Sequence, residues 1–229
     1  MTVFVITFLL GCLSVMTVRG KRGNWPAGMP VARPRLVAVG GTYEGGRGVP
    51  SDAYVVQERL VAAARGVGGA LALGAVVAAR PQHGEQSLDE CVRAARDASR
   101  RGVGTGPAGD LDLVVLERAE SPLLRFAHVG DGEIWHCPRG AEPLRLTAPR
   151  GSALPAAPDP EVGSVVLRPG DRVAIVSAGA VEALGAARMR ELFGGGTSPG
   201  ACLDRLYDEM AAVEPGCDAT VIIAEFVTA

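Results

Sequence analysis

The chain has 229 residues and a net charge of −2, with 48% hydrophobic and 21% charged residues. This length and apolar content are enough for one sizeable folded domain and exclude a disordered chain. The small net charge gives no electrostatic basis for binding nucleic acid. The five scattered cysteines form no CxxC pair, which argues against a disulfide framework or a zinc knuckle and favours a reducing compartment.

The first 32 residues differ from the domain expected over residues 33–229. Residues 2–18 are apolar and three basic residues follow them closely. One interpretation is a short membrane anchor that leaves the main domain in the cytoplasm, at the inner face of the membrane. A second is a mis-set start, with Met29 as the true initiator, and a third is export. The sequence leaves these open, and we expect the domain to be cytoplasmic.

Apolar runs separated by Gly and Pro predict a series of strands and helices. The first half of the domain is expected to contain a strand at 35–39, a Gly-rich loop at 40–50, a hairpin over 52–64, a helix ending near 80 and a helix at 88–101. The second half is expected to contain a three-strand antiparallel meander over 111–137, short strands at 144–146, 164–167 and 172–177, helices at 180–193 and 199–213, and a buried strand at 219–226. This order predicts an α+β fold with sheets formed by long-range pairing.

The stretch Phe126–Trp135, FAHVGDGEIW, is central to the predicted meander. It indicates a strand, a tight Gly-Asp-Gly turn and a second strand, and we therefore expect a hairpin here. Asp131 lies within the turn and is interpreted as capping it.

Five short motifs occur in an order and approximate spacing that resemble those of a known family. They are Asp52-Ala53, AARGVGG at Ala63–Gly69, FAHVGDGEIW at Phe126–Trp135, LRPGDRVAIVSAGAVEAL at Leu167–Leu184, and CDAT at Cys217–Thr220. Over residues 35–226 the chain resembles the bacterial metal-dependent protein phosphatases of the PPM (protein phosphatase 2C) family. The resemblance implies an αββα sandwich of two antiparallel sheets flanked by helix pairs.

The resemblance also implies a chemistry. Members of the family hold two divalent cations, Mg²⁺ or Mn²⁺, with carboxylates at one edge of the sandwich, and a metal-bound water attacks a phosphoserine or phosphothreonine. Hard cations prefer oxygen ligands, and negative charge is needed to hold two of them close together. The ions activate the water and clamp the transferring phosphoryl group.

The positions that match the family's carboxylates carry other residues here. They are Ser51, Arg65, Ala178 and Cys217, and Gly66 is retained beside Arg65 at this degenerate site. All four carboxylates are therefore replaced, one of them by a cation. From this pattern we expect no dinuclear metal site and no cofactor, although the family would use Mg²⁺ or Mn²⁺.

Two neighbouring acids, Asp52 and Asp218, could substitute for the missing ligands if the protein is active. Each lies one residue past a replaced position, and successive residues of a strand point to opposite faces, so substitution would require a bulge or a shifted register. We expect Arg65 to fill the vacated site and pair with one of these acids. Arg65 could also hold an anion such as a phosphorylated side chain.

These observations predict a catalytically inactive pseudophosphatase, a regulatory or binding partner in Ser/Thr phosphorylation signalling. Its expected partner is a protein, such as a Ser/Thr kinase or a phosphoprotein, with no nucleic acid, and with the membrane only if residues 2–18 are an anchor. The alternative is a divergent metal-dependent phosphatase that hydrolyses phosphoserine or phosphothreonine with displaced carboxylates.

Overall fold

The computed structural model describes residues 33–46, 52–66, 68–83, 87–103, 109–117, 122–148 and 159–228. The predictions for residues 2–18, Met29 and Ser51 lie outside these ranges and stay predictions. Within the ranges, no helix is both long and apolar enough to cross a membrane.

The strands described form two antiparallel five-stranded sheets. The first has the order β1 (Pro34–Tyr43), β10 (Ala219–Thr228), β9 (Arg172–Val176), β6 (Glu133–Cys137) and β7 (Leu144–Arg145). The second has the order β2 (Asp52–Val56), β3 (Leu60–Arg65), β4 (Leu111–Leu116), β5 (Leu123–Val129) and β8 (Glu161–Val166).

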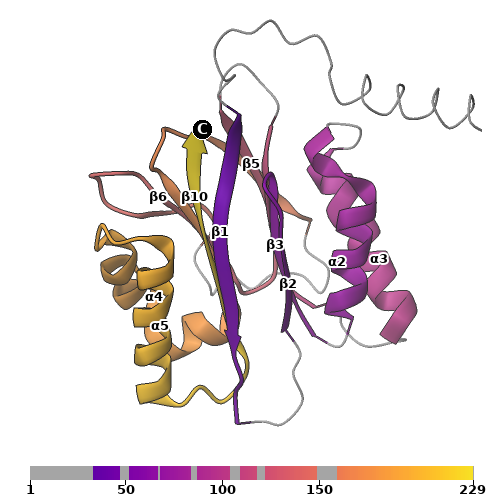
Figure 1. Cartoon of the computed structure of the whole chain (residues 1–229). Coiled ribbons are helices and arrows are strands. Elements are labelled where there is room, and N and C mark those ends of the chain that lie inside the picture. Colours follow the sequence, from indigo (N-terminus) through magenta and orange to yellow (C-terminus); the bar gives the residue numbers. More distant parts are fainter. Residues whose placement is uncertain are drawn as a thin grey trace, which may run out of the picture. The chain divides into compact units, whose positions relative to one another are not determined.

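Two helix pairs cover the outer faces of the sheets (Figure 1). The pair α2 (Gly69–Ala79) and α3 (Leu88–Val103), with the short 3₁₀ turn η1 (Pro81–His83) between them, packs on the second sheet. The pair α4 (Ala178–Gly194) and α5 (Pro199–Val213) packs on the first sheet. A third apolar core lies between the sheets. The predicted αββα sandwich is confirmed.

Local sequence explains where the helices begin. At α3, the Ser87 backbone N–H donates to Glu90 Oε2 at 3.3 Å, which is one of the two hydrogen bonds of a capping box. At α5, the Ser198 hydroxyl accepts from the Ala201 N–H at 3.3 Å, and Pro199 occupies the first turn. The helix at 180–193 begins earlier than expected, at Ala178, directly after β9.

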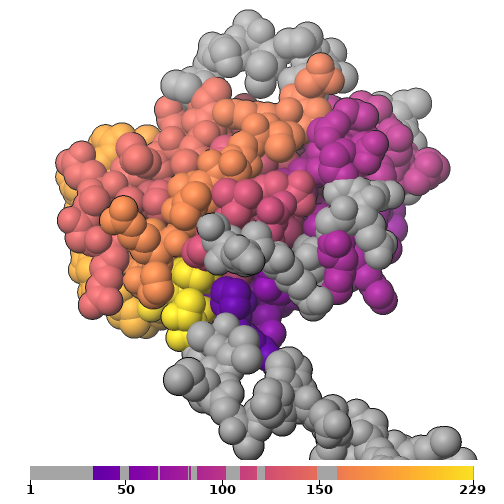
Figure 2. Space-filling view, turned by 90° about the horizontal axis from the view of Figure 1, so that it is seen from above, coloured from indigo at the N-terminus to yellow at the C-terminus, as the bar shows by residue number. Residues whose placement is uncertain are grey.

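The first strand is longer than predicted, because the Gly-rich stretch does not begin as a loop. β1 continues through Gly40 and Gly41 to Tyr43, and its register with β10 runs from Pro34 opposite Thr228 to Tyr43 opposite Ala219. In Figure 2, β10 in yellow lies beside β1 in indigo. A side chain at Gly41 would collide with the Tyr207 hydroxyl, so glycine permits close packing here rather than a turn.

The predicted three-strand meander over 111–137 is wrong in its last step. β4 and β5 pair as expected, but β6 pairs with β7 and β9 in the other sheet. The Gly-Asp-Gly segment is therefore a crossover between sheets, with Gly130 at φ +115°. Alternating apolar residues indicate a strand and its faces, but they do not specify which sheet it joins.

Candidate functional site

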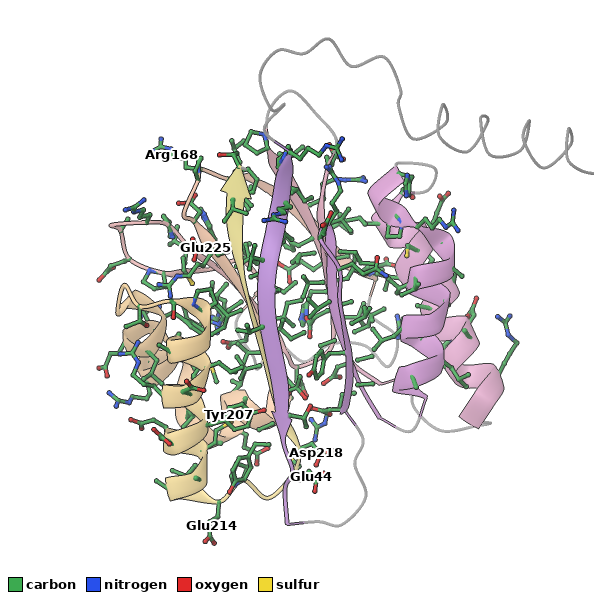
Figure 3. The ribbon with its side chains drawn as sticks, viewed as in Figure 1. Glu44, Arg168, Tyr207, Glu214, Asp218 and Glu225 are labelled. Carbon is green, nitrogen blue, oxygen red and sulfur yellow. The ribbon has the colours of Figure 1, made fainter. Side chains whose placement is uncertain are left out.

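One end of the sandwich gathers the positions that the sequence motifs singled out. It is formed by the end of β1, the start of β2, the end of β3, the junction of β9 with α4, and the start of β10. Asp218 and Glu44 lie at this end, and Arg168 and Glu225 lie at the opposite end (Figure 3). Long-range strand pairing thus assembles motifs that are far apart in the sequence.

A chain of hydrogen bonds connects the two sheets at this end. The Thr220 hydroxyl donates to Asp52 Oδ2 at 2.8 Å and lies 2.8 Å from the Thr42 hydroxyl. The Thr220 backbone N–H donates to the Ser177 hydroxyl at 2.9 Å. These bonds join β1 and β10 of the first sheet to β2 of the second and hold the Asp52 side chain between the sheets.

Asp218 lies directly against Asp52. Its Oδ2 accepts from the Asp52 backbone N–H at 3.4 Å, and its Oδ1 accepts from the Gly45 N–H at 3.1 Å. Strand alternation was expected to turn each acid away from the ligand position that it follows, and this stays a prediction; Asp218 precedes the first residue of β10, so its direction is set by the loop. The structure therefore brings the two acids together without a bulge at either position.

The Asp52 carboxylate is incompletely satisfied. Its Oδ1 is buried and has no hydrogen-bond partner. Burial raises the pKa of Asp52, and the negative charge of Asp218 adds to this, whereas the Thr220 and Ser177 hydroxyls and the charge of Arg65 oppose it. The Ser177 hydroxyl lowers the pKa of Asp52 although it makes no hydrogen bond to Oδ1. Asp52 is thus a carboxylate held in a setting that disfavours its charged form.

Arg65 lies next to two acids, Asp52 and Asp110, of which Asp110 was not predicted, and its expected ion pair with Asp52 or Asp218 stays a prediction. Arg65 is the residue directly opposite Asp52 in the β2–β3 ladder. On its other side, the Arg65 N–H donates to the Asp110 carbonyl oxygen at 3.0 Å. The anion-binding role of Arg65 stays a prediction.

The remaining positions also lie at this end. Ala178 is buried at the first residue of α4, and Cys217 is half-buried. A side chain at Gly179 would collide with the Asp218 carbonyl oxygen and would lie 3.2 Å from the Cys217 sulfur, so α4 begins against the loop that carries Cys217 and Asp218. Gly66 has φ +97° directly after β3, a conformation that favours glycine.

Sequence reasoning missed several polar residues near the site. Asp112 on β4 and His128 on β5 are paired across the ladder, and their side chains lie 2.6 Å apart with both residues buried. Burial lowers the pKa of His128, but the hydrogen bond to Asp112 outweighs this and leaves the pKa raised. The available signal was a charged residue inside the apolar run LDLVVL, which indicates a buried polar partner.

The positions of the carboxylates show in part whether this site is suited to a metal ion. The buried, unpartnered Asp52 Oδ1 beside Asp218 is the kind of oxygen that a hard cation prefers. The guanidinium of Arg65 opposes a second ion, since Arg65 lies opposite Asp52 where the resemblance expects a carboxylate. In the described ranges, no group of three or more His, Cys, Asp or Glu side chains is arranged to hold a metal ion. The described residues thus offer the two neighbouring carboxylates of Asp52 and Asp218, with the positive charge of Arg65 beside Asp52.

Comparison of the sequence with known families finds no family that matches, and no curated protein matches it significantly. The structure, in contrast, is similar to solved bacterial phosphatases. The catalytic domain of the Ser/Thr protein phosphatase PstP, solved in complex with two manganese ions, superposes with a TM-score of 0.66 at 20% identity, covering 85% of this chain and 100% of that domain.

Two further structures are similar to the same extent. The PPM Ser/Thr phosphatase MsPP from Mycobacterium smegmatis, in complex with cacodylate, gives a TM-score of 0.67 at 21% identity, covering 83% of this chain and 98% of that one. PppA, a regulatory component of the type VI secretion system in Pseudomonas aeruginosa, gives 0.64 at 16% identity, covering 85% and 100%. This chain therefore has the fold of the PPM-type Ser/Thr phosphatases.

The comparison corrects one expectation. The sequence led us to expect no cofactor, but the PstP catalytic domain of the same fold holds two manganese ions. The expectation of no cofactor is therefore wrong, because a protein of the same fold binds two metal ions. Mn²⁺ is the ion whose binding has to be measured on this chain, with Asp52 and Asp218 as the residues that could hold it.

Proposed function

We propose that this chain is a pseudophosphatase, a protein with the PPM phosphatase fold that acts as a regulatory partner in Ser/Thr phosphorylation signalling and does not hydrolyse phosphoesters. The observation that carries this proposal is the position of Arg65. A guanidinium lies on β3 opposite Asp52, at the place where the resemblance expects the carboxylate between two metal ions. Arg65 is a fixed positive charge, and it opposes the close pair of divalent ions that the phosphoryl transfer requires.

The other site positions support the same function. Ala178 and Cys217, which also replace expected carboxylates, come together with Arg65 at one end of the sandwich. Substitutions scattered over the surface would not support the loss of a catalytic site. The fold around them, with its two sheets and three apolar cores, is intact. An intact scaffold with an altered site is what a binding function needs.

We propose a protein partner that belongs to a phosphorylation pathway, such as a Ser/Thr kinase or a phosphoprotein. PppA gives a precedent for a protein of this fold in a regulatory assembly. Binding of the full chain to matched phosphorylated and unphosphorylated peptides, measured by fluorescence anisotropy, tests the phosphoprotein class. Equal binding of both peptide sets would remove that class and leave a folded kinase domain as the partner to test.

The decisive experiment is a hydrolysis assay on the full chain with p-nitrophenyl phosphate and a phosphothreonine peptide, with and without Mn²⁺. We expect no turnover above buffer. The matched variant restores the carboxylates (S51E, R65D, A178D and C217D together), and we expect it to gain Mn²⁺-dependent turnover. A variant with three of these changes that keeps Arg65 is the control and is expected to stay inactive.

One observation favours a second function. Asp52 and Asp218 are in direct contact, and Asp52 Oδ1 is buried without a partner, so a divergent phosphatase could use one ion on these displaced carboxylates. In that case the unmodified chain turns over substrate with Mn²⁺, and D52N and D218N each abolish turnover. That result would replace the pseudophosphatase proposal.

A further inference from the structure

The end of the second sheet carries charges in the order negative, positive, negative, at the start of β2, at the end of β3 and directly before β4. Asp52 is opposite Arg65 in the β2–β3 ladder. The ladder between β3 and β4 ends with Ala64 opposite Leu111. One residue further, the Arg65 N–H donates to the Asp110 carbonyl oxygen. Arg65 is thus flanked by one aspartate on each side.

Arg65 and Asp52 lie on the same face of the sheet, because they are direct partners in the β2–β3 register, and the Asp110 carboxylate, directly before β4, lies close to Gly130. Val61 and Ala63 of β3 belong to the core between the sheets, and Arg65 follows them at the same period of two residues. Cross-strand neighbours on one face have their Cβ atoms about 4.5–5.5 Å apart. The side chain of Arg65 is therefore a direct neighbour of Asp52, and its charge also acts on Asp110.

The charge of Arg65 acts on both aspartates. Burial raises the pKa of Asp52 and of Asp110, and in each case the charge of Arg65 acts in the opposite direction. Both carboxylates also feel other acids, Asp218 in the case of Asp52 and Asp112 in the case of Asp110. The charge of Arg65 therefore offsets part of the repulsion among the acids at this end of the sheet.

Resting on the proposed function, we infer that Arg65 is an internal cation that competes with a divalent metal ion for the carboxylates of Asp52 and Asp110 and so sets the metal affinity of this site. A guanidinium carries a permanent charge and donates N–H groups to the same oxygens that a hard cation would bind. It therefore neutralises the acids and repels an incoming ion. The unpartnered Asp52 Oδ1 is the oxygen left available to that ion.

Calorimetric titration of Mn²⁺ into the full chain tests this inference. R65A is expected to bind Mn²⁺ about tenfold more tightly than the unmodified chain, or better, because a fixed positive charge next to the ion is removed. R65K keeps the charge and is expected to stay close to the unmodified chain. The matched control is R125A, which removes a half-buried arginine of the same sheet that pairs with Glu117 instead. R125A is expected to leave Mn²⁺ affinity unchanged.

Thermal unfolding gives a second measurement that does not depend on activity. In metal-free buffer R65A is expected to unfold about 2–4 °C lower, because two partly buried carboxylates lose their counter-charge. Saturating Mn²⁺ is expected to recover this loss. Adding D52N and D110N to R65A is expected to remove both the loss of melting temperature and the gain in Mn²⁺ affinity. This result would assign both effects to these two acids.

The outcomes separate this inference from the proposed function. Equal Mn²⁺ affinity of R65A and the unmodified chain overturns the inference alone, and Mn²⁺-dependent turnover by the unmodified chain overturns the proposed function alone. Should R65A fail to fold, R65Q replaces it and is compared with R65K. Tighter Mn²⁺ binding by R65Q than by R65K then supports competition, and equal binding contradicts it.

Discussion

Asp171 and Asp52 lie at opposite ends of the sandwich and have opposite surroundings. Asp171 accepts from the backbone N–H groups of Arg139 and Arg168, each at 2.9 Å, and lies 3.2 Å from His136 Nε2. Burial opposes its charge, but these donors outweigh burial and hold the pKa of Asp171 below its usual range. Asp52 has one side-chain hydrogen bond and a buried oxygen with no partner.

The contrast separates a structural acid from a site acid. Asp171 holds the turn before β9 against the end of β6, and its hydrogen-bond donors favour the carboxylate strongly enough to outweigh burial. Asp52 is held where its charge is disfavoured, next to Asp218 and opposite Arg65. A buried polar atom without a partner is uncommon in folded proteins and calls for an explanation. The proposed pseudophosphatase site would provide that explanation.

The largest effect is expected when the structural acid is removed. D171A would leave two backbone N–H donors and the His136 ring unpaired, and we expect it to lower the free energy of unfolding by about 3 kcal/mol. Urea unfolding followed by circular dichroism measures this loss. D52A is the comparison at the other end and is expected to cost clearly less. Equal losses would contradict the distinction between the two acids.

The next effect concerns the loop that carries Asp218. A side chain at Gly179 would collide with the Asp218 carbonyl oxygen, so G179A has to displace backbone and is expected to cost about 2 kcal/mol. Gly74, inside α2, has nothing within 4 Å of an added Cβ, and G74A is the matched control. That control is expected to stabilise the protein by about 0.5–1 kcal/mol through helix propensity. A G179A protein as stable as G74A would mean that the loop carrying Asp218 can move away from an added Cβ at little cost.

The smallest effect is the pH dependence of stability, which has opposite signs at the two ends. The pKa of Asp171 is lowered in the folded protein, so its stabilisation is present above the unfolded pKa of about 3.9 and is lost as pH falls through the folded value. The pKa of Asp52 is raised, so its charge costs stability as pH rises from about 3.9 through the folded value.

Melting temperatures of D171N and D52N across this pH range measure the difference. D171N is expected to melt at a lower temperature than the unmodified chain at neutral pH. The difference in melting temperature is expected to become smaller in acid. D52N is expected to be at least as stable as the unmodified chain at neutral pH and to lose that advantage in acid. A D52N protein that melts lower at neutral pH would show that the Asp52 charge is stabilising in the folded state.

The sequence by itself determined most of the elements and the altered site. Apolar alternation and the turn residues located strands and helices, because these signals act between residues close in the chain. Order and spacing of the motifs indicated the fold, and Arg65, Ala178 and Cys217 showed that expected carboxylates are replaced. These conclusions need only the identity of residues at matched positions.

Only the tertiary structure decided how the elements combine. Alternation does not specify a strand's partner, so the crossing of β6 to the other sheet was not predicted. The contact between Asp52 and Asp218 depends on a loop before β10, and the position of Asp110 beside Arg65 depends on pairing between β3 and β4. Such contacts join residues far apart in the chain, and their geometry is set by packing of the two sheets rather than by any local pattern.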